Sequence, residues 1–430
     1  MSDGTLYWIW LAQKLGAGNR YLPYLMERYS DAFEVFRADP EELFDTEIPE
    51  ALQEALSDKN LDEALAISDY CTKLRIGILT YKSDLYPAGL RRLKDPPTVL
   101  YYKGKMPDLS KFVSLSVVGT RTMSEYGKRA GYKIAYELAS AGVCVVSGMA
   151  LGVDSVAACA ALEAGSTTIA VLGSGVDVIY PKVHTALYKK IIERGAVISE
   201  YPPTSRPESH HFPQRNRIIS GIGMGTLVVE GDMRSGALIT AGLALEQGKD
   251  LFALPGNIGE TNASGTNALL RDGADLVLDA SDILNRYSLY HANKLDFARL
   301  SRAKTHSTVS DEVLLRYGVH LDEGESKKPA PARRAPVKRS EIQNQGENPE
   351  TAAQAAPKNE PAVTANDTKA LDQLPEKYRE IFGAIPDGRP VSFDEVLAVC
   401  KTPGEAMSAL TFLEIKGAVS SLPGGYYLKN

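Results

Sequence analysis

The sequence predicts an α/β protein with a Rossmann-like, doubly wound parallel sheet at its centre. From residue 112 onward, short apolar runs alternate with amphipathic stretches of helical spacing. Runs such as FVSLSVVG (112–119) and TLVVEG (226–231) are apolar almost throughout, which is typical of parallel strands covered on both faces. Glycine-rich loops follow these runs, where each strand gives way to a helix. We therefore expect one such domain over about residues 75–290.

Local signals place the elements of this domain. SEYGKRAGYKIAYELASAG (124–142) is an amphipathic helix, with Ser124 as its N-cap and Gly142 as its C-terminal stop. Two strands are expected before it, at 77–81 and 98–104, and the prolines of YPAGLRRLKDPP predict an extended turn between them. The further strands expected are VCVVSG, TTIAVLG, AVISE, TLVVEG, LFALPG and DLVL. Two further helices are expected to end near Ala164 and Arg194, and three more to span 212–222, 236–247 and 264–272.

The flanking regions differ from this pattern. Residues 1–70 predict short helices, such as LYWIWLAQKL and PEALQEAL. Residues 323–370 have the composition of a disordered linker, whose basic start (327–340) is either a solvated segment, which we favour, or a weak polyanion contact. Three helices and a hairpin around 423–425 make residues 371–430 a winged helix. Its third helix sets Glu405 and Glu414 against Lys401 and Lys416, which favours packing or protein contact over DNA contact.

Bulk composition excludes some classes of protein. The 430 residues are too many for a single core, and no apolar run is long enough to cross a membrane. The N-terminus lacks the features of a signal peptide. The four cysteines form no CxxC pair, which disfavours a zinc site or disulfides and suits a reducing cytoplasm. A net charge of −6 argues weakly against nucleic-acid binding but does not exclude a local basic groove.

The loops that follow the strands predict an anion-binding site. Ligands of open parallel sheets bind at the carboxyl ends of the strands, and glycines let backbone N–H groups approach an anion there. The loop residues are Gly119, Thr120, Arg121, Ser147, Gly148, Gly173, Gly175, Arg234, Ser235 and Gly236. Neither a dinucleotide fingerprint nor a P-loop is present, and Gly173 and Gly175 alone are equally consistent with a turn required by packing.

Charged residues near these loops allow two interpretations. Arg121, Lys182, Arg215, Arg217 and Arg234 could bind phosphate, or each arginine could form a surface ion pair, for example with Glu230 or Asp232. No catalytic set is recognisable, and Glu230 is either a general base or, as we favour, an anchor for loop N–H groups. The adjacent His210 and His211 make a poor metal pair, so we predict no metal.

Several motifs resemble the DprA/Smf family of DNA-processing proteins. They occur in order between about Tyr86 and Ala274: YPAGLRRLKDPPTVLYYKG, VVGTR, SGMALGVD, GSGVDVIYP, SEYPP, FPQRNRIISG, VVEGDMRSGALITAGLALEQGKDLFALPG and SGTNALLRDGA. The resemblance implies a SAM-like N-terminal region and a C-terminal winged helix. It also implies that the Rossmann-like domain binds single-stranded DNA and protects incoming strands. The protein would load RecA onto strands coated with single-strand-binding protein during natural transformation. It would act as a dimer, without catalysis and without a cofactor.

The same resemblance implies which residues contact DNA. Arg215, Asn216 and Arg217 match its FPxRNR motif, and the two arginines would bind successive backbone phosphates. Phe212 and Tyr180 are candidates for base stacking, with simple packing as the alternative. The complete set implied is Gly119, Thr120, Arg121, Ser147, Gly148, Gly173, Gly175, Lys182, Phe212, Arg215, Asn216, Arg217, Ser235 and Gly236.

Three positions depart from the family pattern: Ala158, His184 and Thr204 stand where histidine, asparagine and glycine are common. Two rival functions stay open. One is a nucleotide-processing enzyme resembling Rossmann-like phosphoribohydrolases, although GIGMGTLVVEG lacks their PGG and puts Glu230 at the end of a strand. The other is an interaction scaffold that recruits partners through its winged helix.

Overall fold

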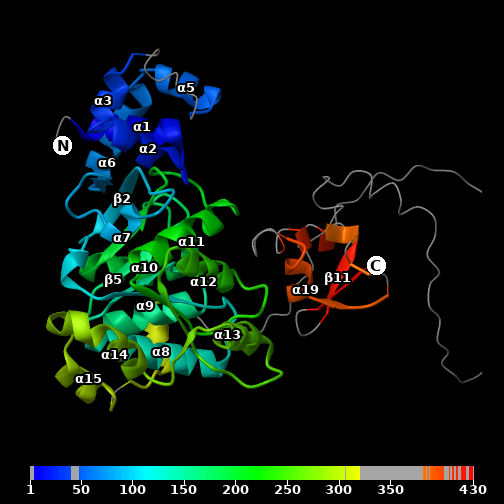
Figure 1. The fold of residues 1–430 in the computed structure, drawn as a ribbon. Coiled ribbons are helices and arrows are strands. Elements are labelled where there is room, and N and C mark those ends of the chain that lie inside the picture. Colours follow the sequence, from blue (N-terminus) through cyan, green and yellow to red (C-terminus); the bar gives the residue numbers. More distant parts are fainter. Residues whose placement is uncertain are drawn as a thin grey trace, which may run out of the picture. The chain divides into compact units, whose positions relative to one another are not determined.

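A computed structural model describes residues 4–39, 48–305, 307–319 and, with short gaps, 381–429 (Figure 1). The chain forms two compact units, residues 1–330 and residues 331–430, and each is described by itself. The linker that we predict at 323–370 lies outside the described residues. Among the helices that are described, none has both the length and the apolar character needed to cross a bilayer.

A nine-stranded sheet in the order β1-β2-β6-β5-β4-β3-β7-β8-β9 is the centre of the first unit. From β6 to β9 all neighbouring strands are parallel, which confirms the predicted parallel sheet. β2 runs antiparallel to both β1 and β6. The strands are β1 (Gly77–Thr80), β2 (Val99–Gly104), β3 (Ser114–Val118), β4 (Cys144–Ser147), β5 (Thr168–Val171), β6 (Ala196–Ser199), β7 (Gly225–Val228), β8 (Asp250–Ala253) and β9 (Asp275–Leu276).

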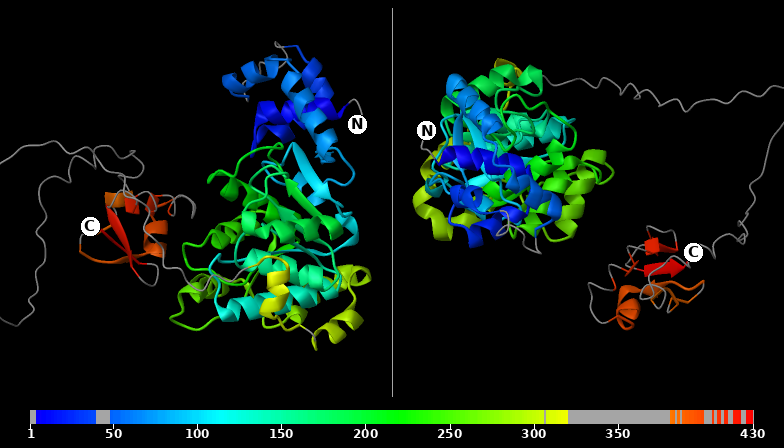
Figure 2. Two further views of the ribbon diagram at one scale, coloured as in Figure 1. Left: turned by 180° about the vertical axis from the view of Figure 1, so that it is seen from behind. Right: turned by 90° about the horizontal axis from the view of Figure 1, so that it is seen from above.

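Helices cover both faces of this sheet. One apolar core lies between the sheet and α8, α9, α10, α14, α15 and α16, and a second lies between the sheet and α7, α11, α12 and α13. Figure 2 gives two further views of this arrangement, from behind and from above. The helices are α7 (Ala88–Arg91), α8 (Glu125–Ser140), α9 (Val153–Glu163), α10 (Thr185–Arg194), α11 (His211–Ile222), α12 (Gly236–Glu246), α13 (Thr261–Arg271), α14 (Ala280–His291), α15 (Phe297–Ala303) and α16 (Asp311–Arg316).

The chain reverses direction across the sheet between β3 and β7. It leaves β3 toward β4, β5 and β6, and then returns to place β7 on the other side of β3. The loops that follow β3 and β7 therefore diverge onto opposite faces and leave a crevice between them, which is where open α/β sheets bind ligands.

Two details of the helices test the sequence prediction. The hydroxyl of Ser124 accepts a hydrogen bond from the Gly127 N–H, which confirms the predicted N-cap of α8. The extended turn predicted between β1 and β2 is wrong, because α7 forms there. Pro87 precedes its first turn, where the missing N–H costs nothing, and Leu90 is fully buried against the second core.

The N-terminal region is helical, as predicted, and is built from α1 (Thr5–Leu15), α2 (Tyr21–Arg28), α3 (Ala32–Arg37), α5 (Glu50–Ser57) and α6 (Asp62–Leu74). α1 buries Trp8, Ile9 and Trp10. The core of this region continues onto β2 through Val99 and Tyr101. The N-terminal helices are therefore packed onto the antiparallel edge of the sheet, as the blue and cyan ribbons of Figure 1 show.

Of the predicted winged-helix elements, the described residues of the second unit include one helix and the hairpin. β10 (Val391–Ser392), β12 (Tyr426–Lys429) and β11 (Val419–Leu422) form a three-stranded sheet in that order, and the pairing of β11 with β12 is the expected hairpin. α19 (Phe393–Leu397) follows β10, and the buried residues of the unit include Val391, Val396 and Leu410. Of the charged residues discussed for the third helix, only Glu414 belongs to the described part of the chain.

Candidate nucleic-acid interface

A groove of ≈ 700 Å³ opens at the crevice between β3 and β7, and we call it the switch-point groove. Its walls come from the loops after β3 and β7 and from the first turns of α11 and α12. The structure brings eight of the predicted site residues together here: Gly119, Thr120, Arg121, Phe212, Arg215, Asn216, Ser235 and Gly236. The groove also contains Tyr180, a predicted candidate for base stacking, and Arg234, a predicted candidate for phosphate binding, together with Ile239 and Thr240, which were not predicted.

An exposed cation above aromatic rings is the most distinctive feature of this groove. The guanidinium carbon of Arg121 lies 5.7 Å from the centre of the Phe212 ring. Tyr180 is 44% exposed, and its ring centre is 5.6 Å from that of Phe212, at an angle of 42°. Arg121 therefore offers its charge to solvent, while the two rings offer flat apolar surface beside it.

Arg215 has a different role from the one that we predicted. It is only 4% exposed, and its Nη1 donates to the carbonyl oxygens of Gly148, at 2.9 Å, and Val171. Burial lowers the pKa of Arg215 to about 10, opposed by the charge of Asp154, so the guanidinium remains protonated at neutral pH. The Asp154 carboxylate also accepts from the Gly148 N–H at 3.0 Å. Arg215 thus ties together the loops that form the floor of the groove.

Arg217 points to the other side of α11. It is 4% exposed, its Nη2 lies 2.7 Å from Glu200 Oε1, and its Nε lies 3.3 Å from Asp95 Oδ2. Residues two apart on a helix do not share a face, so Arg215 and Arg217 cannot line one track. Both arginines are buried and engaged by protein partners, so the geometry disfavours the prediction that they bind successive phosphates.

The remaining predicted residues support the groove from below or lie outside it. Ser147 is 1% exposed, and its hydroxyl donates to the Val117 carbonyl at 2.7 Å. A Cβ on Gly148 would come within 2.5 Å of the Arg215 guanidinium, so a larger residue there would displace that side chain. Gly173 lies beneath Phe212 and lines a recess of ≈ 50 Å³ beside the groove.

Gly175 and Lys182 are not part of the groove lining. Gly175 is buried, and a Cβ on it would come within 2.8 Å of Asp177 Oδ1 and of the Pro202 carbonyl oxygen. This contact agrees with the interpretation of a tight turn. Lys182 is exposed at the start of a 3-10 turn (Lys182–His184), two residues after Tyr180.

Glu230 anchors the loop after β3. Its carboxylate accepts from the Ser124 N–H at 2.9 Å and from the Ser124 hydroxyl, and it is 5% exposed. Its backbone carbonyl accepts from the Thr120 N–H at 2.8 Å. Gly127 must lack a side chain, since a Cβ would come within 2.2 Å of Glu230 Oε2. These contacts support the anchoring role over the role of general base.

Two of the three unusual positions make identifiable contacts. The ring Nδ1 of buried His184 lies 3.0 Å from the carbonyl oxygen of Met149, which has a left-handed φ of 54°. Thr204 has a φ of 69°, a conformation that glycine adopts without strain. Its N–H donates to Asp177 Oδ1 at 2.9 Å. Ala158 is simply buried in α9.

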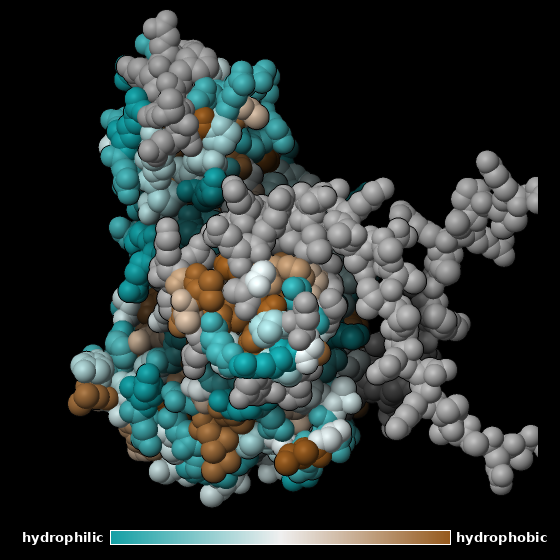
Figure 3. All heavy atoms as spheres, turned by 45° about the vertical axis from the view of Figure 1, so that its right-hand side comes forward, coloured by the Kyte–Doolittle hydropathy of each residue, from teal (hydrophilic) through white to brown (hydrophobic). Residues whose placement is uncertain are grey.

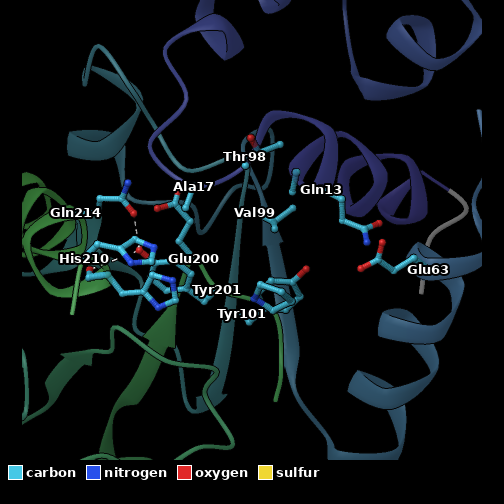
Figure 4. Close-up of a pocket in the computed structure, with 14 residues that line it drawn as sticks. Gln13, Ala17, Glu63, Thr98, Val99, Tyr101, Glu200, Tyr201, His210 and Gln214 are labelled. Atoms are coloured by element: carbon cyan, nitrogen blue, oxygen red, sulfur yellow. Dashed lines mark hydrogen bonds between the residues drawn. The ribbon is translucent and has the colours of Figure 1, made fainter. Parts of the chain in front are cut away.

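A second cavity, of ≈ 430 Å³, lies between α1 and the strands β2 and β6, and we call it the interdomain cavity (Figure 4). Val99 and Tyr101 of β2 form one side, and Gln13 of α1 and Glu63 of α6 another. Glu200, Tyr201, His210 and Gln214 close it beside α11. This cavity could not be predicted from the sequence, because its lining comes from five separate parts of the chain.

Comparison with known proteins agrees with this geometry. The model of the family described as DNA recombination-mediator protein A matches residues 77–288, and that of the DprA winged helix domain matches residues 365–425. Protein Smf of Synechocystis is 30% identical over 98% of both chains. The chain belongs to the DprA/Smf family.

Other relatives match a smaller share of this DprA/Smf chain. Protein Smf of Escherichia coli is 45% identical over 203 residues, which are 47% of this chain but only 54% of that protein. The crystal structure of DprA from Streptococcus pneumoniae is 34% identical, covers 65% of this chain and 97% of its own, and superposes with a TM-score of 0.56. The family motifs therefore coincide with the fold that carries the switch-point groove.

One residue of the groove, Asp154, was not among the predicted site residues. Asp154 is the buried counter-ion of Arg215 and lines the groove. The available signal was its place in SGMALGVD, directly after one of the glycine-rich loops.

Proposed function

We propose that this DprA/Smf protein binds single-stranded DNA in the switch-point groove and acts as a recombination mediator. The observation that carries the proposal is the exposed Arg121 above Phe212, with the partly exposed Tyr180 beside it. A single strand offers both phosphates and unpaired bases, and this arrangement provides a cation for the former and rings for the latter. Membership of a family described as a recombination mediator supports the same assignment.

Each group in the groove has a proposed role. Arg121 binds a backbone phosphate, and the first turn of α12, with Ser235 and Gly236, offers N–H groups and a positive helix end to a second. Phe212 and Tyr180 stack on bases without selecting among them. Asn216 accepts from Arg215 Nε at 3.2 Å, which leaves its amide N–H groups for a phosphate or a base edge. Lys182 extends the cationic surface beyond the groove.

The wider activity is proposed from the family resemblance. The protein protects incoming single strands and loads RecA onto strands coated with single-strand-binding protein, without catalysing a reaction of its own, and it works as a homodimer in the cytoplasm. Large apolar side chains are exposed after β9 and on α14, where Leu278 is 70% and Leu289 78% exposed. Figure 3 shows apolar side chains exposed in several small groups on one face. Such surfaces are typical of protein contacts.

Fluorescence anisotropy with a labelled oligo-dT across a salt series tests the DNA-binding proposal. The parent protein should bind with a steep salt dependence, and Arg121→Ala and Lys182→Ala should each weaken binding. Arg271→Ala is a matched control, since Arg271 is exposed on α13 and forms its ion pair with the neighbouring Asp272. No binding by the parent at low salt, or equal binding by the Arg121 variant, would contradict the assignment.

RecA loading needs its own measurement. We expect the protein to shorten the lag of RecA ATPase activity on single strands coated with single-strand-binding protein, and removal of residues 371–430 distinguishes two versions of the proposal. If the truncated protein binds DNA normally but no longer acts with RecA, the winged helix recruits the partner. If it keeps both activities, the first unit is sufficient.

A further inference from the structure

The segment 207–212 forms a ridge between the two cavities. Pro207, Ser209 and Phe212 line the switch-point groove, whereas His210 and His211 line the interdomain cavity. Three potential metal ligands lie on this ridge, and one ligand atom from each of Glu208, His210 and His211 is within 4.8 Å of the others. Two neighbouring histidines are a poor metal pair by themselves, but the fold supplies a third donor.

One of the two imidazoles is oriented by its surroundings. His211 Nδ1 lies 3.0 Å from the Gly173 carbonyl oxygen, and since a carbonyl can only accept, this nitrogen carries the proton. Nε2 then keeps its lone pair, which is the form that binds a metal. The ring is also stacked on Tyr201, with centres 3.8 Å apart and planes at 24°. A backbone carbonyl behind a histidine ligand is the usual support in metal sites.

The other two donors are free to adjust. The side chains of His210 and Glu208 are 62% and 60% exposed, and His210 Nδ1 lies 3.6 Å from Glu208 Oε2. Ligand atoms of a tetrahedral zinc ion lie about 3.3 Å apart, given Zn–N distances of about 2.0–2.1 Å. Rotation of the exposed His210 and Glu208 side chains can shorten the distances between ligand atoms to this value without moving the backbone.

We propose that Glu208, His210 and His211 bind one Zn²⁺ ion on this ridge. Two imidazoles and one carboxylate suit zinc and leave a fourth position for water, as in three-ligand zinc sites. The positive end of α11 disfavours a cation and the charge of Glu208 offsets it, so we expect weaker affinity than in a closed four-ligand site. The bound ion fastens the 207–210 segment to the first turn of α11, beside Phe212 of the groove.

Zinc titration of the full-length, untagged protein without DNA tests the proposal, with a chromophoric indicator as competitor and Co²⁺ as a spectroscopic probe. We expect one site per chain to be lost, or weakened at least tenfold, in His210→Ala and in Glu208→Gln. Both residues are exposed, so these variants should fold. His291→Ala, which removes a histidine from the end of α14, is the control and should bind as the parent does.

Two results would overturn the zinc site. One is zinc binding by the His210 and Glu208 variants with unchanged affinity, and the other is the absence of a stoichiometric site in the parent. Because no DNA is present in the titration, either result leaves the single-strand proposal untouched. Conversely, loss of oligo-dT binding in Arg121→Ala does not bear on the zinc ligands.

Discussion

Helix α11 separates two regions that use positive charge in opposite ways. On one side lies the switch-point groove, where the exposed Arg121 stands over Phe212 without a carboxylate partner at ion-pair distance among the described residues. On the other side Arg217 is buried against Glu200 and Asp95, close to the N-terminal helices, whose Gly18 N–H also donates to Glu200. The comparison teaches that burial, rather than residue type or motif, decides whether an arginine can serve a ligand.

The sharpest test of this contrast is Arg217→Ala, for which we expect the largest effect. Removing the cation leaves the Glu200 carboxylate buried and uncompensated, so the free energy of unfolding should fall by roughly 3–5 kcal/mol. Thermal and urea unfolding of the full chain measure this loss. The salt slope of oligo-dT binding should not change at temperatures where the variant is folded. A lower slope would place Arg217 in the DNA site after all.

The pH dependence of the stability loss in Arg217→Ala tests whether the uncompensated Glu200 carboxylate causes it. Burial already raises the pKa of Glu200, and Arg217 opposes the shift, so removing Arg217 raises this pKa further. A carboxyl group whose folded pKa is raised takes up a proton on folding, so its charge destabilises less as pH falls. The difference in unfolding free energy between the variant and the parent should therefore shrink between neutral pH and about pH 5. A constant difference would indicate lost packing instead.

Arg215→Lys tests a residue that is buried like Arg217 but lies at the groove like Arg121. Lysine keeps the charge but cannot reach both the Gly148 and Val171 carbonyls, so one buried acceptor loses its partner at a cost of about 1–3 kcal/mol. We expect reduced stability together with weaker oligo-dT binding, because the loop that carries Gly148 forms the groove floor. Unfolding and anisotropy measured on the same preparation check both effects. Normal stability with weaker binding would make Arg215 a direct phosphate ligand.

Arg121→Ala should show the reverse of the Arg217 variant. Its side chain is exposed, so the unfolding free energy should change by less than about 0.5 kcal/mol. The loss of one phosphate contact should lower the slope of log affinity against log salt by about 1. Arg271→Ala is again the matched control. A stability loss larger than this would show that Arg121 is structural.

Thr204→Gly, away from both arginine sites, is expected to change stability alone. Glycine adopts the left-handed φ of 69° without strain and keeps the N–H that donates to Asp177, so stability should rise by about 0.5–1 kcal/mol. Differential scanning calorimetry would detect the increase. DNA binding should stay unchanged, since Thr204 does not line the groove. A decrease in stability would mean that the threonine side chain makes a contact of its own.

The fold could be predicted to the extent that its signals are local. Ser124 caps α8 through a neighbour three residues away, and the apolar runs of the sheet are continuous in the sequence. The burial and hydrogen bonding of Arg215 could not be predicted, because its acceptors on Val171 and Gly148 lie 44 and 67 residues away. The helix α7 was missed for a similar reason: the burial of Leu90 by distant partners outweighs the extended preference of its prolines.

The loops of the groove are joined to one another before any ligand arrives. The Thr120 N–H donates to the Glu230 carbonyl, the Val153 N–H donates to the Thr120 carbonyl at 3.2 Å, and the Asn262 amide donates to the Thr122 carbonyl at 2.8 Å. In the proposed complex the groove is a preorganised receptor, and the conformational entropy lost on association falls mainly on the nucleic acid. Capture of a strand should then be limited by diffusion and electrostatic steering rather than by loop rearrangement.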